Sequence, residues 1–122
     1  MARAQLQAQA LETYVVGADG TWFTARDGRR IGLTRKWILR TILRVLVQAR
    51  VEAPGHGLST QELMAQVWVD SPIKRRHLRN RLHVSLNGLR RLGLQELLVR
   101  RGDGYLLLPG ACEVVPTEAA RV

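Results

Sequence analysis

The chain has a single cysteine, Cys112, so it cannot form an internal disulfide. This cysteine usage is typical of a reducing compartment, and we expect a cytoplasmic protein. No apolar run approaches the length of a membrane span. Residues 1–9 mix Arg and Gln with Ala and lack the apolar core of a signal peptide. We therefore expect no membrane partner.

Residue patterns for catalysis or metal binding are also missing. The three histidines, His56, His77 and His83, lack metal-ligand spacing with one another, with Cys112 and with acidic residues. No glycine-rich loop carries the Lys-Ser/Thr pair of a phosphate-binding loop, and no Ser, His and acid are spaced as a catalytic triad. We expect a protein that is not an enzyme and that needs no cofactor or metal.

Acidic residues are absent between Asp70 and Glu96, where seven Lys or Arg residues occur. Over all 122 residues, 19 Lys and Arg outnumber 10 Asp and Glu, which gives a net charge of +9. The hydrophobic fraction of 46% is normal for one globular domain. A folded domain with this charge favours a polyanionic partner, and composition alone leaves DNA, RNA and an anionic membrane surface open.

The first half of the chain combines strand and helix signals. Short β-prone runs split by two Asp-Gly pairs predict a small N-terminal antiparallel sheet of three strands over residues 13–33. Apolar spacing then predicts a helix over 36–51, with Thr34 as its N-cap. The motif Ser59-Thr-Gln-Glu62 is a capping box, which predicts a short helix that ends near Val69.

The second half predicts a basic helix and a hairpin. Leucines at helical spacing (Leu78, Leu82, Leu86 and Leu89) indicate a helix over about 74–92 that stops at Gly93. Two β-prone runs on either side of a Gly-Asp-Gly tip predict a hairpin over 97–108. We expect a flexible lead-in (1–12), one domain (13–110) and a C-terminal tail (111–122) that is disordered in part.

Three segments carry a family resemblance. LSTQELMAQVW (Leu58–Trp68), LHVSLNGLRRLGL (Leu82–Leu94) and VRRGDGYLLL (Val99–Leu108) look like the second helix, the recognition helix and the wing of OmpR/PhoB-type effector domains. The similarity covers about Tyr14 to Pro109. It implies an α+β fold of the winged helix-turn-helix class, with a small N-terminal antiparallel sheet, three helices and a C-terminal β-hairpin wing.

The resemblance also implies a function, which is sequence-specific binding of double-stranded DNA by a transcriptional regulator. The recognition helix, about 74–92, would enter the major groove, and the wing, about 97–108, would lie on the minor groove or the backbone. RNA polymerase and a second copy of the chain on DNA are further partners that it allows. Nothing in the chain resembles a receiver domain, so it is either an effector part of a longer protein or is controlled by another route.

Helical geometry and the resemblance together select candidate contact residues. If the four leucines face inward, Arg76, Asn80, His83 and Asn87 lie roughly opposite them. Arg and Asn side chains can form paired hydrogen bonds to guanine and adenine edges. For base edges we expect Arg76, Arg79, Asn80 and His83. For the DNA backbone we expect Arg75, Ser59, Thr60, Asn87, Arg90, Arg91, Arg100 and Arg101.

Other functions remain open from the residues alone. A winged-helix fold can also bind proteins, so the basic helix could meet an acidic partner surface. RNA is a weaker alternative, because the major groove of A-form RNA is too narrow for a helix. Ser59 could serve as a helix cap only, and one of the two hairpin arginines, Arg100 and Arg101, could simply be solvated.

Overall fold

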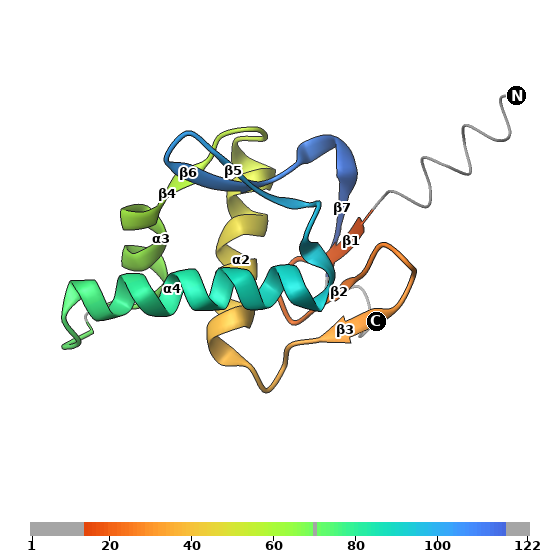
Figure 1. Ribbon diagram of the computed structural model, residues 1–122. Helices are drawn as coiled ribbons and strands as arrows, with labels where there is room; N and C mark the ends of the chain where they lie inside the picture. Colours follow the sequence, from red (N-terminus) through yellow and green to blue (C-terminus); the bar gives the residue numbers. More distant parts are fainter. Residues whose placement is uncertain (1–13, 70, 117–122) are drawn as a thin grey trace, which may run out of the picture.

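The computed structural model describes residues 14–69 and 71–116, and this part of the chain forms an α+β fold (Figure 1). It contains three α-helices: α2 (Trp37–Glu52), α3 (Thr60–Val67) and α4 (Arg75–Leu89). It contains seven strands: β1 (Tyr14–Gly17), β2 (Trp22–Thr24), β3 (Arg30–Gly32), β4 (Leu58–Ser59), β5 (Leu98–Arg101), β6 (Gly104–Leu107) and β7 (Cys112–Val115). None of the helices described is long and apolar enough to cross a membrane. The lead-in expected over residues 1–12 lies outside this part.

The first sheet has the strand order β3-β2-β1-β7. β1, β2 and β3 pair antiparallel, so the predicted three-stranded meander is confirmed. Val16 of β1 lies opposite Phe23 of β2, and both side chains are fully buried. Because alternate residues of a strand face the same side, this register directs one side of the sheet into the core.

The fourth strand corrects two expectations. We expected the folded domain to end at residue 110 and the sheet to be antiparallel, but β7 continues the fold to Val115 and pairs parallel to β1. Arg50 of α2 holds the start of this strand, because its Nη2 donates to the carbonyl oxygens of Pro109 (3.0 Å) and Cys112 (2.9 Å). Burial raises the pKa of the Cys112 thiol to about 11, so it stays protonated and unreactive. Residues 117–122 lie outside the described part.

The helix predicted over 36–51 is confirmed as α2, but Thr34 is not its cap. The N-cap is Lys36, and no side chain caps this end. The chain first makes a turn in which the Lys36 N–H donates to the Leu33 carbonyl oxygen (2.9 Å), and Thr34 lies inside that turn. Leu33 is fully buried, so it holds the turn in place and moves the helix start downstream.

The second sheet has the order β4-β6-β5 and contains the predicted hairpin. Gly102 takes a φ of 65° at the tip, which is a conformation that glycine adopts without strain. β4 adds a short third strand, with Leu58 opposite Tyr105 and Ser59 opposite Gly104. This pairing joins the residues just before α3 to the hairpin.

α4 forms over much of the predicted range and ends in a wider turn. A π-helical segment, Arg90–Leu94, follows Leu89, and within it Gly93 has a φ of 145°. The four predicted leucines of α4 are all buried, and they join one core with residues of α2, α3 and both sheets. The arrangement is compatible with a small winged-helix-like domain.

Candidate nucleic-acid interface

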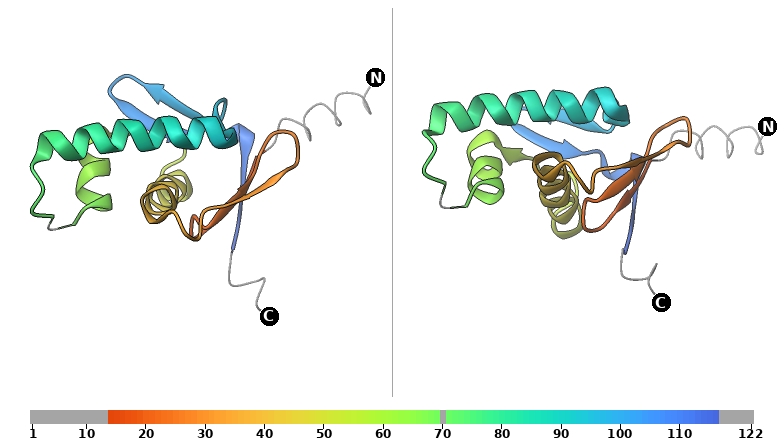
Figure 2. Two further views of the ribbon diagram at one scale, coloured as in Figure 1. Left: turned by 60° about the horizontal axis from the view of Figure 1, so that its bottom comes forward. Right: turned by 90° about the horizontal axis from the view of Figure 1, so that it is seen from below.

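α4 lies along one side of the molecule. In the right panel of Figure 2, α2, α3 and both sheets lie on the same side of α4, and its other side is open. Leu78, Leu82, Leu86 and Leu89 are at most 7% exposed and anchor the helix to the core. The side chains that alternate with them at helical spacing are therefore presented to solvent.

The outer face of α4 carries both cations and amides. Arg76, Asn80, Asn87 and Arg91 are exposed and follow one another at spacings that keep them on one face of a helix. Val84 lies in the middle of this row and is 63% exposed. We call these five residues the outer row. It combines hydrogen-bond donors and acceptors with one apolar side chain, which are the groups that read base edges in a major groove.

The flank of α4 that faces the hairpin is more enclosed. His83 is half-buried, and its Nδ1 shares a hydrogen bond with the Tyr105 hydroxyl of β6 at 3.4 Å. Arg79, one turn before His83, is exposed. His83 therefore has a structural partner within the fold, which limits how far its ring can turn toward a ligand.

Two arginines also contact Tyr105 where the hairpin packs against α4. The guanidinium carbons of Arg90 and Arg100 lie 5.9 Å and 5.8 Å from the centre of its ring, within cation–π range. The Nε of Arg90 donates to the Leu98 carbonyl oxygen (3.2 Å), and its Nη1 contacts the Asn87 Oδ1 (3.5 Å). These contacts fix Arg90 in place and hold two positive charges beside the outer row.

The hairpin places its own cations next to the start of α3. Arg101 and Ser59 both lie opposite Gly104, on the two sides of β6. Arg100 and Arg101 are exposed, while Tyr105 beside them is buried. The buried Tyr105 ring therefore anchors the hairpin, and the guanidinium groups of Arg100 and Arg101 point outward.

At the start of α3 the predicted capping box is confirmed. The Ser59 hydroxyl accepts from the Glu62 backbone N–H (3.1 Å), and the Glu62 carboxylate accepts from the Ser59 N–H (2.8 Å). The hydrogen bonds from Ser59 hold the pKa of the Glu62 carboxyl below its usual value. Ser59 is thus engaged within the fold, and a carboxylate lies where a phosphate would approach. Thr60 is half-buried in the first turn.

Replacing Ser59 by alanine should lower the free energy of unfolding by about 1 kcal/mol, because the Glu62 N–H loses its acceptor. The Glu62 pKa is lower in the folded state, so its share of the stability is present above the unfolded pKa and is lost as the pH falls through the folded value. Urea unfolding at pH 7 and pH 3 should therefore show a larger Glu62→Ala penalty at pH 7 than at pH 3. Ser59→Thr, which keeps a hydroxyl, is the control and should cost a few tenths of a kcal/mol.

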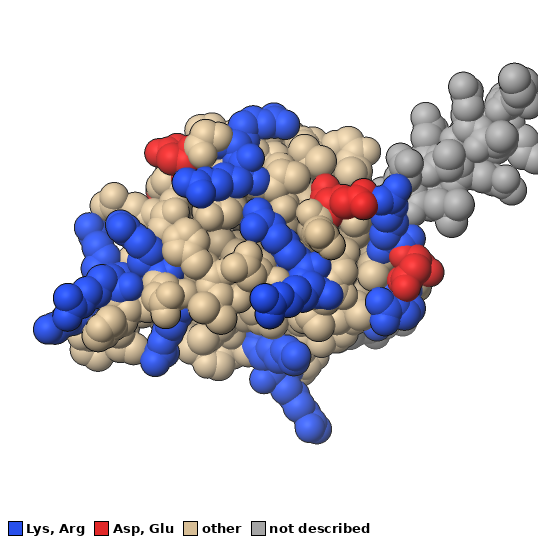
Figure 3. All heavy atoms as spheres, in the orientation of Figure 1, with Lys and Arg blue, Asp and Glu red and all other residues tan. Residues whose placement is uncertain are grey.

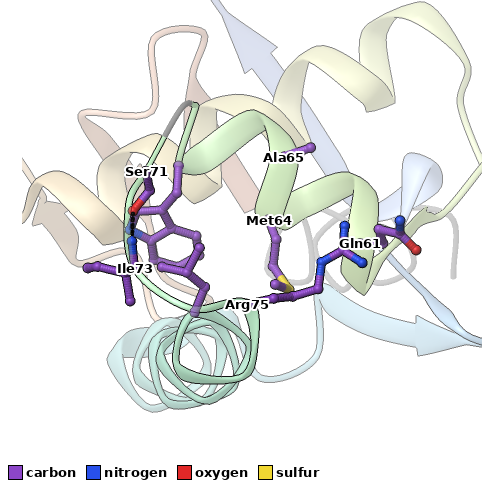
Figure 4. Close-up of a pocket in the computed structure, with 8 residues that line it drawn as sticks. Gln61, Met64, Ala65, Ser71, Ile73 and Arg75 are labelled. Atoms are coloured by element: carbon purple, nitrogen blue, oxygen red, sulfur yellow. Dashed lines mark hydrogen bonds between the residues drawn. The ribbon is translucent and has the colours of Figure 1, made fainter.

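A pocket of about 220 Å³ lies between α3 and the start of α4 (Figure 4). Arg75 extends from α4 across the pocket toward Gln61 of α3. Trp68 lines the pocket and is 8% exposed, yet its indole Nε1 has no hydrogen-bond partner among the described residues. A buried donor without an acceptor is costly. Because this Nε1 is itself out of contact with solvent, the group that an approaching anion can reach at the pocket is the guanidinium of the exposed Arg75.

The charge on this side of the molecule is nearly all positive. Figure 3 shows Lys and Arg atoms at the N-terminal end of α4, along it and on the hairpin. The acidic atoms visible on the same face lie near the hairpin tip and toward the first sheet. Within the described residues, the ion pairs join Arg26 to Glu96 and Arg29 to Asp27, away from α4.

Most residues expected at the interface lie on this face. Arg75, Arg76, Arg79, Asn80, Asn87, Arg91, Arg100 and Arg101 are exposed on α4, its π-helical extension and the hairpin, whereas His83, Arg90, Ser59 and Thr60 are half-buried. Sequence reasoning missed Val84 and Arg81. Val84 and the exposed Arg81 were detectable, because both avoid the leucine stripe on a helical projection. The Trp68 indole Nε1, which lacks a partner among the described residues, has no sequence signal, since only packing decides which donors lose water.

No group of His, Cys, Asp or Glu in residues 14–69 and 71–116 is arranged to hold a metal ion. Comparison with known proteins finds no matching family model, no similar curated protein and no similar solved structure. The geometry and charge of the α4 face are therefore the features that bear on function.

Proposed function

We propose that this chain binds double-stranded DNA in a sequence-specific manner, as a winged-helix transcriptional regulator and not as an enzyme. The observation that carries the proposal is the outer row, which lies on an exposed helix whose opposite stripe is buried in the core. No acidic residue occurs from Ser71 to Gln95, so nothing on this helix opposes a polyanion.

In this proposal α4 enters the major groove, which is wide enough to admit an α-helix. Arg76 can pair with the O6 and N7 of guanine, and Asn80 with the N6 and N7 of adenine. Val84 adds an apolar surface for a thymine methyl group. Arg79 and His83 flank the row on the hairpin side, where Arg79 is the freer of the two.

The β5–β6 hairpin serves as the wing. Arg100 and Arg101 reach the minor groove or the phosphates beside it, and the contact of Tyr105 with His83 keeps the wing at a set distance from α4. The resemblance to OmpR/PhoB-type effector domains supports this assignment of helix and wing. It also suggests RNA polymerase and a second copy of the chain on DNA as partners.

Backbone contacts come from the ends of the face. Arg91 and Asn87 lie toward the C-terminal end of α4, and Arg75 lies at its N-terminal end beside the pocket. A phosphate oxygen at this pocket would pair with the exposed guanidinium of Arg75. Ser59 and Thr60 add at most a weak contact, because the capping box already occupies this helix end.

The proposal predicts a salt signature. With about six phosphate contacts, the logarithm of the association constant should fall against the logarithm of salt concentration with a slope near −5. Fluorescence anisotropy with a labelled random duplex, from about 50 to 200 mM salt, measures this slope. Selection from a random duplex pool then supplies the specific site.

Two results would contradict the proposal. One is no binding of duplex DNA at the lowest salt, and the other is selection that returns no motif. A double-stranded RNA of the same length is the control and should bind more weakly, because its narrow major groove excludes α4. A protein adaptor for acidic partner surfaces would fail both DNA measurements.

A further inference from the structure

The start of α2 carries a second basic surface, which includes an exposed tryptophan. Arg35 and Lys36 are exposed, and Trp37 is 50% exposed. A shallow groove of about 420 Å³ is lined by Arg35, Lys36, Trp37, Ile38, Leu39 and Ser85. We call Arg35, Lys36 and Trp37 the α2 rim. A large half-exposed ring directly after two exposed cations is typical of a contact surface more than of a solvated loop.

The charges of the α2 rim have no acidic partner in the described part of the chain. The ion pairs found there involve neither Arg35 nor Lys36, and the first turn of α2 contains no acidic residue. The side chain of Arg40, one turn after Lys36, donates to the Thr34 carbonyl oxygen and to no acidic residue of the described part. The rim is therefore a site of uncompensated positive charge, which an anionic partner would neutralise.

The α2 rim is continuous with the flank of α4 that faces away from the hairpin. Ser85 of α4 lines the same groove as Trp37, and a side chain placed on Gly88 would meet Leu39 of α2. Arg81 lies four residues before Ser85, so it shares this flank, and it is exposed. In Figure 3, Lys and Arg atoms project below α4, where Figure 1 places the start of α2.

α4 thus has cations on both sides. The hairpin with Arg100 and Arg101 lies along one flank, and the α2 rim lies along the other. A major groove is bordered by two phosphate strands about 12 Å apart, so a helix seated in it meets one strand on each side. The hairpin arginines and the α2 rim, one on each flank of α4, match the two phosphate strands. An acidic protein surface that contacted α4 would need cations on one flank only.

We propose that the α2 rim binds the phosphodiester strand across the major groove from the strand that the hairpin approaches. This inference rests on the proposed function, since it needs α4 to occupy the groove. Arg35 and Lys36 supply charge to the phosphates, and the Trp37 ring packs against the sugars between them. DNA is favoured over an acidic protein because cations border α4 on both flanks, as the two phosphate strands border a major groove.

The test compares two double variants that remove the same charge. Arg35→Ala with Lys36→Ala should weaken binding to the selected duplex about tenfold at 0.1 M salt and should reduce the magnitude of the salt slope by about 2, at roughly 0.9 per phosphate lost. Arg29→Ala with Arg44→Ala removes two exposed arginines outside the rim and should weaken binding less than threefold, with little change in slope. Thermal unfolding should confirm that both variants fold.

A second measurement follows Trp37 directly. DNA should change the fluorescence of the wild-type protein, and Trp37→Phe should remove most of that change, because Trp22 and Trp68 lie outside the rim. Equal affinities and slopes for the two double variants would contradict DNA binding by the α2 rim, and so would an unchanged fluorescence signal in Trp37→Phe. If Arg76→Ala still weakens binding in that case, the proposed DNA binding by α4 stands without the rim. If duplex DNA is not bound and Arg76→Ala has no effect, the proposed function itself fails.

Discussion

Replacing Arg76 and Asn80 together by alanine should lower affinity for the selected DNA site about 1,000-fold. Each side chain can form a paired hydrogen bond to a base, and each such pair discriminates by about 1–3 kcal/mol. Two of them give about 4 kcal/mol, which corresponds to this factor. On random duplex the loss should be less than tenfold, because only one charge is removed. Parallel titrations of both duplexes measure the two effects.

The chain offers a matched control on another helix. Arg44 and Gln48 are both exposed on α2 and have the same spacing as Arg76 and Asn80, so Arg44→Ala with Gln48→Ala removes the same chemistry away from α4. This control should stay within threefold of the wild type on both duplexes. Equal losses on specific and random DNA in the α4 variant would show that the two residues contact phosphates, and base readout would then be assigned to other residues.

Gly93→Ala should cost about 4 kcal/mol of unfolding free energy, which is a large share of the stability of a domain of this size. Gly93 has a φ of 145°, where a residue with a side chain is strained by about 1–3 kcal/mol. A Cβ there would also lie 2.9 Å from the Ala25 Cβ and 3.3 Å from the Phe23 ring. Forcing a methyl group into this contact adds an overpacking penalty of about 1–3 kcal/mol.

Gly102→Ala separates backbone strain from overpacking as causes of the loss expected for Gly93→Ala. Gly102 has a φ of 65° at the hairpin tip, and a Cβ there would meet nothing within 4 Å. It should cost about 1 kcal/mol, which reflects backbone strain alone. Urea unfolding followed by circular dichroism measures both variants. Similar losses in the two would mean that the end of α4 can move away from β2, and the close packing of Gly93 would not contribute.

Much of the candidate interface could be predicted because it lies on one helix. The four leucines define the buried stripe of α4, and helical geometry then identifies Arg76, Asn80 and Asn87 as outward. His83 shows the limit of this reasoning. Its position on the projection is intermediate, and only the packing of β6 against α4 gives it Tyr105 as a partner. Which flank of a helix is covered depends on residues distant in sequence.

The α2 rim could not be predicted from the sequence for the same reason, because it depends on packing between distant segments. Lys36, Arg40 and Arg44 follow one another at helical spacing, but nothing local shows that the start of α2 borders α4. Ser85 and Trp37 are 48 positions apart in sequence and line one groove only because their helices pack together. A run of basic residues can thus be identified in a sequence, but only tertiary packing brings the basic start of α2 next to α4.

Local sequence determined the helices, the Ser59 capping box and the Gly-tipped hairpin, because periodicity, capping and turn chemistry act over a few residues. Tertiary structure alone decided the parallel pairing of β7 with β1, the turn that shifts the start of α2 past Thr34, and the burial of the Trp68 indole N–H away from any acceptor of the described residues. Each of these depends on contacts between segments far apart in the chain, whose energies appear only when the whole core closes.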